Sequence, residues 1–254
     1  MIGHLPPLDM HAHLNPKISA YELGELKSVI FAVTRSLSDS RQVVDRTDPD
    51  TVWGIGCHPA IGSSRREFEE LEFMLLVERS AFVGEVGLDG SRSEIVYQME
   101  LLIRVLRILA SAPRIVSLHS YAATTQVLEV LESTNAKGVV LHWWLGSDSE
   151  TKRAVELGCY FSINESMINN GRFHPSIPSD RLLSETDHPF GNRTESQNGR
   201  PGGVGAVETA IAETYGLSSE HTRRLIWQNL SQLVENVGCY ALLPLSIRAR
   251  IASM

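Results

Sequence analysis

The sequence is poor in cysteine, in positive charge and in long apolar runs. Its three cysteines, Cys57, Cys159 and Cys239, have no CxxC spacing, which argues against a thiolate zinc site. An odd number of cysteines without paired spacing also argues against a disulfide framework. We therefore expect the three thiols to lie in the core as small apolar residues.

Positive charge is in deficit: 23 Lys and Arg stand against 30 Asp and Glu, a formal net charge of -7. This balance argues against broad adhesion to nucleic acid, which relies on a basic field. It does not exclude a nuclease, because bound divalent ions supply positive charge locally.

Apolar runs are short everywhere, whereas spanning a bilayer takes roughly 18 apolar residues in succession. The first residues, MIGHLPP, also lack the basic and apolar regions of a secretory signal. We therefore expect a cytoplasmic protein that does not contact a membrane.

What the chain does contain is a series of eight short β-rich runs, separated by polar or helix-like stretches. Several are almost continuously apolar, such as VIFAV at 29–33, which is typical of strands buried on both faces of a parallel sheet. The predicted strands cover residues 5–10, 28–34, 51–56, 81–86, 114–119, 138–143, 159–163 and 181–186.

Helix signals occupy most of the stretches between these runs. Strand followed by helix, eight times over, predicts an α/β fold, the (β/α)8 TIM barrel, as one domain over residues 1–254. An open doubly wound sheet is the alternative. The stretch 16–27 is too short for more than a weak helix, the Gly- and Arg-rich stretch 191–205 predicts a long rim loop, and 236–254 is expected to be a peripheral tail. The predicted helices are 64–79, 94–110, 124–131, 148–157, 203–215 and 220–234.

Potential metal ligands stand where the apolar runs stop. A barrel of parallel strands gathers such residues on one rim. Glu85 illustrates the argument, because an ionised carboxylate at the end of an apolar strand is costly unless it is paired or metal-bound. The candidate ligands are His11, His13, Glu85, His119, His142 and Asp187.

Imidazole and carboxylate ligands suit zinc, manganese or iron, while calcium would need an all-oxygen cage. Glu85 is placed to bridge two ions about 3.5 to 4 Å apart. We therefore expect two divalent metal ions as cofactors, Zn²⁺, Mn²⁺ or Mg²⁺.

The motifs DMHAH, GCHP, GEVGLDG, LHS, LHWWLG and SETDHPF, in this order, resemble the TatD family of metal-dependent deoxyribonucleases in the amidohydrolase superfamily. The likeness runs from about residue 9 to 233, and GEVGLD with ETDHPF is its most specific part. It implies a TIM barrel and metal-ligand roles for the six candidate residues. It also implies that the partner is DNA, bound as a single strand or at a strand end.

Two departures from the family pattern indicate an altered substrate groove. Tyr121 stands where TatD nucleases usually place a basic residue, and HWWLG replaces the usual HCFSG or HCFTG. More narrowly, GLDGS, RIVSLHS, LHWWLGS and LGCYFSIN resemble the TatD-type subunit of four-component Qat anti-phage systems. That likeness implies bacterial defence alongside an ATPase, a small partner and a QueC-like protein.

The expected chemistry is hydrolysis of a phosphodiester by a water that two cations activate. Asp187 is the candidate base or orienter of that water, and Glu85 acts with it as the bridging carboxylate. His58, in GCHP, is a candidate phosphate or ion contact, with a simple rim histidine as the alternative. Arg193 and Arg200, in the predicted rim loop, are candidate phosphate contacts, although a solvated arginine is the alternative for each.

Trp143 and Trp144 follow the sixth run, where one of them is placed to stack on a base. Because neighbouring residues on an extended strand point in opposite directions, at most one of the pair is expected to face the site. Asp89 and Glu165 are candidate partners that orient a ligand histidine.

Two other functions stay open on the sequence. One is a small-molecule amidohydrolase acting on a C–N or ester bond, since that superfamily shares the HxH, the two later histidines and the final aspartate. The other is a metal-binding barrel that serves mainly as a binding subunit of a larger assembly, a reading motivated by the altered groove and the acidic charge.

Overall fold

Eight parallel strands form the inner layer of the computed structural model, which describes residues 5–192 and 199–254. They run in two hydrogen-bonded series, β1-β2-β3 and β4-β5-β6-β7-β8. Isolated bridges, Ile55 with Val83 and Ala12 with His188, join the two series at both seams. The strands are β1 (Leu8–His13), β2 (Val29–Val33), β3 (Thr51–Trp53), β4 (Phe82–Gly87), β5 (Ile115–His119), β6 (Val139–His142), β7 (Tyr160–Ile163) and β8 (Leu182–Ser184).

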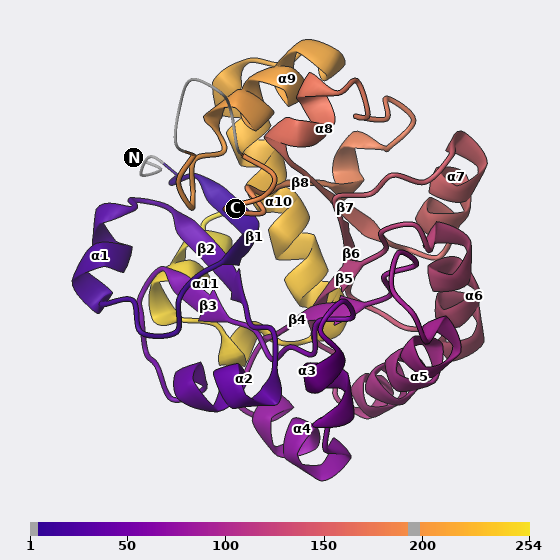
Figure 1. The fold of residues 1–254 in the computed structure, drawn as a ribbon. Coiled ribbons are helices and arrows are strands. Elements are labelled where there is room, and N and C mark those ends of the chain that lie inside the picture. Colours follow the sequence, from indigo (N-terminus) through magenta and orange to yellow (C-terminus); the bar gives the residue numbers. More distant parts are fainter. Residues whose placement is uncertain (1–4, 193–198) are drawn as a thin grey trace.

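Helices surround this layer, and Figure 1 shows them outside the ring of strands. The predicted (β/α)8 TIM barrel is thereby confirmed, and each of the eight predicted runs overlaps a strand, although β1 extends three residues beyond its run and β4 one residue. The helices are α1 (Ala20–Glu25), α2 (Leu37–Val43), α3 (Gly62–Arg66), α4 (Glu70–Val77), α5 (Ile95–Ser111), α6 (Thr124–Thr134), α7 (Asp148–Glu156), α8 (Glu165–Asn169), α9 (Gly205–Tyr215), α10 (Ser219–Val237) and α11 (Leu245–Ile251), with 3-10 turns η1 (Ser179–Arg181) and η2 (Tyr240–Leu242).

Helix α10 closes the barrel at the amino-terminal ends of the strands. The Trp227 indole nitrogen donates a hydrogen bond of 2.9 Å to the carbonyl of Pro6, just before β1. The Asn229 amide donates one of 2.7 Å to the carbonyl of Leu182, the first residue of β8. With this end covered, the carboxyl-terminal ends of the strands form the open rim.

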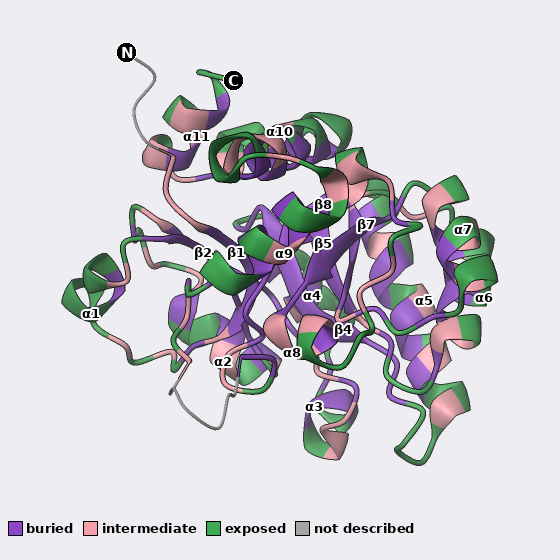
Figure 2. Ribbon diagram, turned by 90° about the horizontal axis from the view of Figure 1, so that it is seen from above, coloured by how far each residue is buried: buried purple, intermediate pink, exposed green. Residues whose placement is uncertain are grey.

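Buried residues, purple in Figure 2, make up most of the strands of the barrel and parts of the surrounding helices. The cysteines Cys57, Cys159 and Cys239 are free and buried, which confirms the expectation of core thiols. No helix within 5–192 and 199–254 is long and apolar enough to cross a membrane.

Three expectations about helices were wrong or incomplete. The single helix predicted at 64–79 is two short helices, α3 and α4, because Glu67 and Glu69 leave the helical conformation between them. This break shifts the helical phase, so Leu71 and Leu75 are exposed while Phe73 is buried.

The tail expected to be peripheral is anchored in the core. Its helix α11 buries Ile247, and the residue Leu243 before it is also buried in the main apolar cluster. Helices α2 and α8 were not predicted, since seven and five residues are too few to show a clear apolar period.

Candidate metal centre

Histidines and carboxylates from five strands meet at the open rim of the barrel. Parallel strands present their carboxyl-terminal ends on the same side, so residues that end separate strands become neighbours in space. The structure brings together all six residues predicted as ligands, and His58, which follows β3, joins them.

Glu85, on β4, lies at the centre of the cluster and is buried. Its Oε1 lies 2.6 Å from His119 Nδ1 and 3.0 Å from His142 Nε2. Its Oε2 faces the other way, at 3.3 Å from His13 Nε2 and 3.7 Å from His11 Nε2. The two oxygens of one carboxylate therefore face different sets of imidazoles, with His58 as a third neighbour of Oε2.

Asp187 completes the side that contains the HxH pair. Its Oδ1 lies 3.6 Å from His11 Nε2 and 3.4 Å from His13 Nε2. The residue has a φ of 42°, in the left-handed region, and its backbone N–H donates a 2.8 Å hydrogen bond to the carbonyl of His11. The turn after β8 thus ties the carboxylate to β1.

His58 stands beside the same oxygen of the central carboxylate, with Nε2 3.1 Å from Glu85 Oε2. Its Nδ1 accepts a hydrogen bond from the backbone N–H of Ala60, so Nε2 carries the ring proton when the imidazole is neutral. Burial lowers the pKa of His58 to about 4. His58 is therefore neutral at neutral pH, with Nε2 close to Glu85 Oε2 but not hydrogen-bonded to it.

The protonation of the cluster reflects burial and mutual charge. Burial opposes a charge on Glu85, yet His58 and His119 hold the pKa of its carboxyl well below the usual range. Burial and the neighbouring His142 lower the pKa of His11. The centre therefore holds an anionic carboxylate and at least one neutral imidazole, the ligand form that binds a cation.

Three ligand-type histidines have a polar side chain near the nitrogen that faces away from Glu85; that of His11 is hydrogen-bonded, whereas His119 Nε2 and His142 Nδ1 have no hydrogen-bond partner among the described residues. His11 Nδ1 is 2.7 Å from Ser117 Oγ, and His119 Nε2 is 3.7 Å from Asp89 Oδ2, where Asp89 was expected to act. Such contacts fix the ring and its tautomer in metal sites. Glu165, the other candidate for this role, begins α8 and is half-buried.

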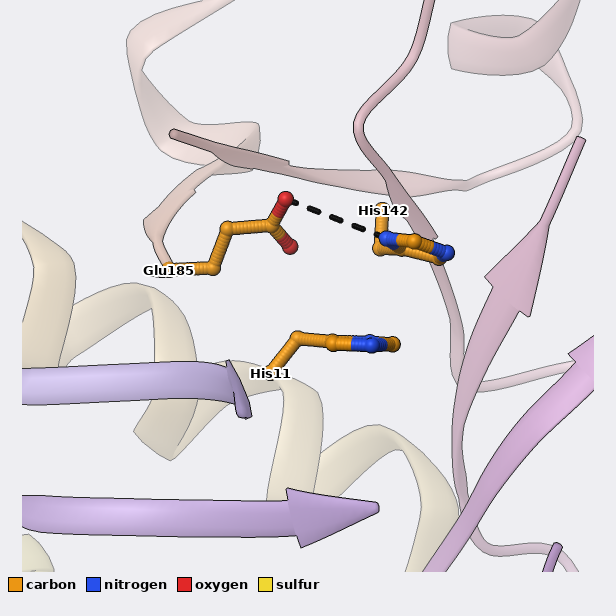
Figure 3. Close-up of side chains that lie close together, drawn as sticks. All are labelled: His11, His142 and Glu185. Atoms are coloured by element: carbon orange, nitrogen blue, oxygen red, sulfur yellow. Dashed lines mark ion pairs between the residues drawn. The ribbon is translucent and has the colours of Figure 1, made fainter. Parts of the chain in front are cut away.

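The third such partner, Glu185, was not predicted. Its Oε1 lies 3.9 Å from His142 Nδ1, and Figure 3 shows its carboxylate directed at that ring. The rings of His11 and His142 lie parallel there, with centroids 3.9 Å apart. A signal existed in the sequence: Glu185 stands two residues before Asp187, and alternate residues of an extended segment share a face.

The cluster passes a test for a cation on its own geometry. Within the described part of the chain, three of its buried atoms have no hydrogen-bond partner and face one another: His11 Nε2, Glu85 Oε2 and Asp187 Oδ1. Buried polar atoms without a partner are costly, and a divalent ion would satisfy all three. The donor set, imidazole nitrogen and carboxylate oxygen, is the one that Zn²⁺ or Mn²⁺ accepts.

A pocket of about 260 Å³ opens above the cluster. Its walls are apolar or aromatic, and none of the described residues that line it is Lys or Arg. The lining residues are His13, His58, Glu85, His119, Ser120, Tyr121, His142, Trp143, Leu145, Asp187 and Phe190.

Only one of the two tryptophans faces the pocket, as expected, but the strand ends at His142 and the left-handed turn at Trp143 separates them in place of strand alternation. Trp143 lines the pocket. Trp144 is completely buried, and its indole nitrogen donates a 2.9 Å hydrogen bond to Thr151 Oγ1 in the core. Trp144 was therefore wrong as a candidate substrate contact, because a side chain without exposed surface cannot touch a substrate.

The arginines expected at the rim are less well placed. Arg200 is exposed and does not line the pocket, while Arg193 lies outside the described residues. Arg35, which directly follows the second predicted strand, was missed although it obeys the same rule as the ligands. Its Nε lies 3.5 Å from His13 Nδ1, and its guanidinium carbon lies 5.7 Å from the centroid of Phe190.

The comparisons with known proteins agree with the fold and identify the family. The family model "TatD related DNase" matches residues 8–235. The chain is 26% identical to the human protein "Deoxyribonuclease TATDN3" over 198 residues, which cover 70% of this chain and 72% of that protein. It is 29% identical to the "3'-5' ssDNA/RNA exonuclease TatD" of Edwardsiella piscicida over 170 residues, covering 61% and 65% respectively.

A solved structure supports the fold independently. The crystal structure of YJJV, a TatD homolog from Escherichia coli K12, matches with a TM-score of 0.78 at 21% identity, covering 92% of this chain and 98% of that one. Because the family model spans most of the chain and its motifs carry the metal centre, the chain belongs to the TatD-related DNase family.

Proposed function

We propose that the protein is a metal-dependent deoxyribonuclease that hydrolyses phosphodiester bonds at the ends of unpaired strands. The observation that carries the proposal is the central carboxylate, whose Oε1 faces His119 and His142 and whose Oε2 faces His11, His13 and His58. The relatives named as a deoxyribonuclease and as a ssDNA/RNA exonuclease support the class of substrate.

The residues of the centre fit a pair of divalent ions, Zn²⁺, Mn²⁺ or Mg²⁺. We infer that His11, His13 and Asp187 would hold one of them, that His119 and His142 would hold the other, and that Glu85 would bridge the two. When bound, the ions would lower the pKa of a water toward neutrality and neutralise charge on the phosphoryl group.

We assign Asp187 as the general base that accepts a proton from the attacking water. Its Oδ1 faces His11 and His13 at 3.6 and 3.4 Å, and it is a pocket residue with a fixed backbone. It accepts a proton of the attacking water as the new P–O bond forms and the bond from phosphorus to the sugar oxygen breaks, and the leaving oxygen takes up a proton from solvent. His58 lies beside the same cluster, with Nε2 3.1 Å from Glu85 Oε2.

In preference to Arg200, which lines neither the pocket nor the groove beside it, we assign the phosphate contact to Arg35. It lines a second groove of about 450 Å³, and His13 lines both this groove and the pocket. A strand whose end lies in the pocket would therefore have its next phosphate beside the Arg35 guanidinium. An arginine fork is suited to that contact.

The test combines metal content and end-labelled strands. Purified protein is assayed for bound metal and then incubated with Mn²⁺ or Mg²⁺, 5'-labelled and 3'-labelled single-stranded DNA, and matched RNA. The Glu85→Gln variant should lose activity by at least about 100-fold, because it removes the bridging anion. The matched control His221→Ala replaces an exposed histidine on α10 and should keep full activity.

A small-molecule amidohydrolase remains a second candidate, because the walls of the pocket that the structure describes include no lysine or arginine. A panel of amides and esters therefore accompanies the strands. Amide or ester turnover without strand cleavage would replace the first proposal by the second.

We also propose, from the narrower sequence likeness, that the nuclease works in bacterial anti-phage defence with an ATPase and a QueC-like protein. Such a role places it in the cytoplasm. Phage plaque assays test this role in cells that carry the genes of the other proposed subunits together with either wild-type protein or Glu85→Gln. Equal protection by both proteins would contradict a nuclease role in defence.

A further inference from the structure

One wall of the pocket is aromatic and apolar, and it is open to solvent. Tyr121 is 54% exposed, Leu145 39% and Phe190 49%, and together with Trp143 they line the pocket beside the metal centre. They come from the turns after β5, β6 and β8. Large apolar side chains exposed together at a catalytic rim indicate a ligand surface.

The most constrained member of this wall is Trp143. Its φ of 43° lies in the left-handed region, which a bulky side chain rarely adopts unless the surroundings enforce it. Its backbone N–H donates a 3.1 Å hydrogen bond to Glu185 Oε1. Glu185 is itself fully buried and is anchored by Ser162 and by Asn164, whose amide nitrogen lies 2.9 Å away.

This turn decides where the two indoles go. Because β6 ends at His142 and the backbone reverses at Trp143, one ring is left at the pocket while Trp144 enters the core. The carboxylate that holds the turn also faces His142 Nδ1. The pocket wall and a ligand histidine are thus fixed by the same side chain.

The size and charge of the pocket restrict the kind of ligand that can occupy it. Its volume, about 260 Å³, lies below the range of roughly 300–1,000 Å³ that is usual for drug-sized ligands, so it admits one ring system and not a base pair. None of its described lining residues is Lys or Arg, so the walls away from the metal ligands offer no cationic side chain to a phosphate. An aromatic wall binds the π-face of any base, with little regard to its identity.

We propose that the pocket is a subsite for a single unpaired nucleobase, which stacks on Trp143 with Tyr121 and Phe190 at its edges. The inference rests on the proposed nuclease function and adds how the strand end is recognised. The base of the terminal nucleotide occupies the pocket, and its phosphodiester lies over the Glu85 cluster. A paired end does not fit, so the enzyme acts on frayed or single strands without sequence preference.

The first experiment measures cleavage of 5'-labelled oligothymidylate by the full chain with Mn²⁺. One strand carries a thymine on its terminal nucleotide, and the other carries an abasic tetrahydrofuran there. Wild-type protein should prefer the thymine end by about 5- to 150-fold in kcat/KM, the range that stacking of one base supplies. Trp143→Ala should bring this ratio close to one, and Trp143→Phe should restore part of it.

The matched control is Tyr21→Ala, which removes an exposed aromatic ring on α1 outside the pocket and should leave the ratio unchanged. An equal fall in kcat/KM for both substrates in Trp143→Ala, with an unchanged ratio between them, would overturn the base subsite. So would a wild-type enzyme that cleaves both ends equally well.

A second measurement does not depend on turnover. Thymidine 5'-monophosphate and 2-deoxyribose 5-phosphate are titrated into the full chain with Mn²⁺ by calorimetry. Wild-type protein should bind the nucleotide at least about 5-fold more tightly than the sugar phosphate, and Trp143→Ala should bind the two alike. If no strand is cleaved but this difference persists, the base subsite stands and the nuclease proposal fails; if the difference is absent, the subsite fails.

Discussion

Removal of the Glu185 carboxylate should cost more stability than removal of any exposed acid in the protein. Glu185→Ala leaves three buried donors without their acceptor: the backbone N–H of Trp143, the amide of Asn164 and the hydroxyl of Ser162. Each buried donor left unpaired costs about 1–3 kcal/mol. Because water can enter the vacated space, we expect the lower part of that range, a loss of about 3 to 5 kcal/mol in the free energy of unfolding.

Thermal unfolding followed by circular dichroism measures this loss. For a chain of 254 residues, each kcal/mol lowers the Tm by about 2–4 °C, so Glu185→Ala should melt about 6 to 20 °C below wild type. Glu185→Gln keeps one acceptor oxygen and should lose about half as much or less. The control Glu165→Ala, at the first turn of α8, should lie within about 0.5 kcal/mol of wild type. A Glu185→Ala protein that melts within about 2 °C of wild type would refute the reasoning.

Three further predictions concern the metal centre, the strand path and the thiols. In the His11→Ala, His13→Ala double variant, elemental analysis should find no bound metal, and nuclease activity should fall by at least about 100-fold. Full biological activity of that variant would instead favour a binding subunit. Arg35→Ala should raise KM several-fold at unchanged kcat. It should also reduce the slope of log affinity against log salt concentration by about 1, measured by strand binding at several salt concentrations. An unchanged slope would show that Arg35 does not contact the strand. Burial raises the pKa of Cys57 and of Cys159 from 9.0 to about 12, so the folded state keeps protons that the unfolded chain releases above pH 9. The stability that these neutral thiols provide should therefore be lost as pH rises from about 9 to 12, a fall that urea unfolding detects and that Cys→Ala variants should lessen.

The strands and the ligands of the centre were predictable from the sequence for one reason. Parallel strands buried on both faces read as apolar runs, and a polar residue that ends such a run lies at the rim. Glu85 and His142 follow this rule directly. Arg35 follows it too and was overlooked because arginine is not a metal ligand.

The features that escaped prediction depend on contacts between distant segments. Which of Trp143 and Trp144 faces the pocket is decided by the left-handed φ at Trp143, and that conformation is held by Glu185, 42 residues farther along the chain. The break between α3 and α4 turns Leu71 outward for a similar reason, since a local apolar period cannot show where a helix stops and restarts.

The closure of the barrel by α10 has a consequence for biosynthesis. Trp227 reaches the carbonyl of Pro6 across 221 residues of sequence, and Arg223 reaches that of Leu5 across 218. Contacts so distant in sequence form late, since the loop between them must be closed first. While the ribosome is still making the chain, the amino-terminal end of the nascent barrel is therefore open, and its apolar interior stays exposed until α10 is released to cover it.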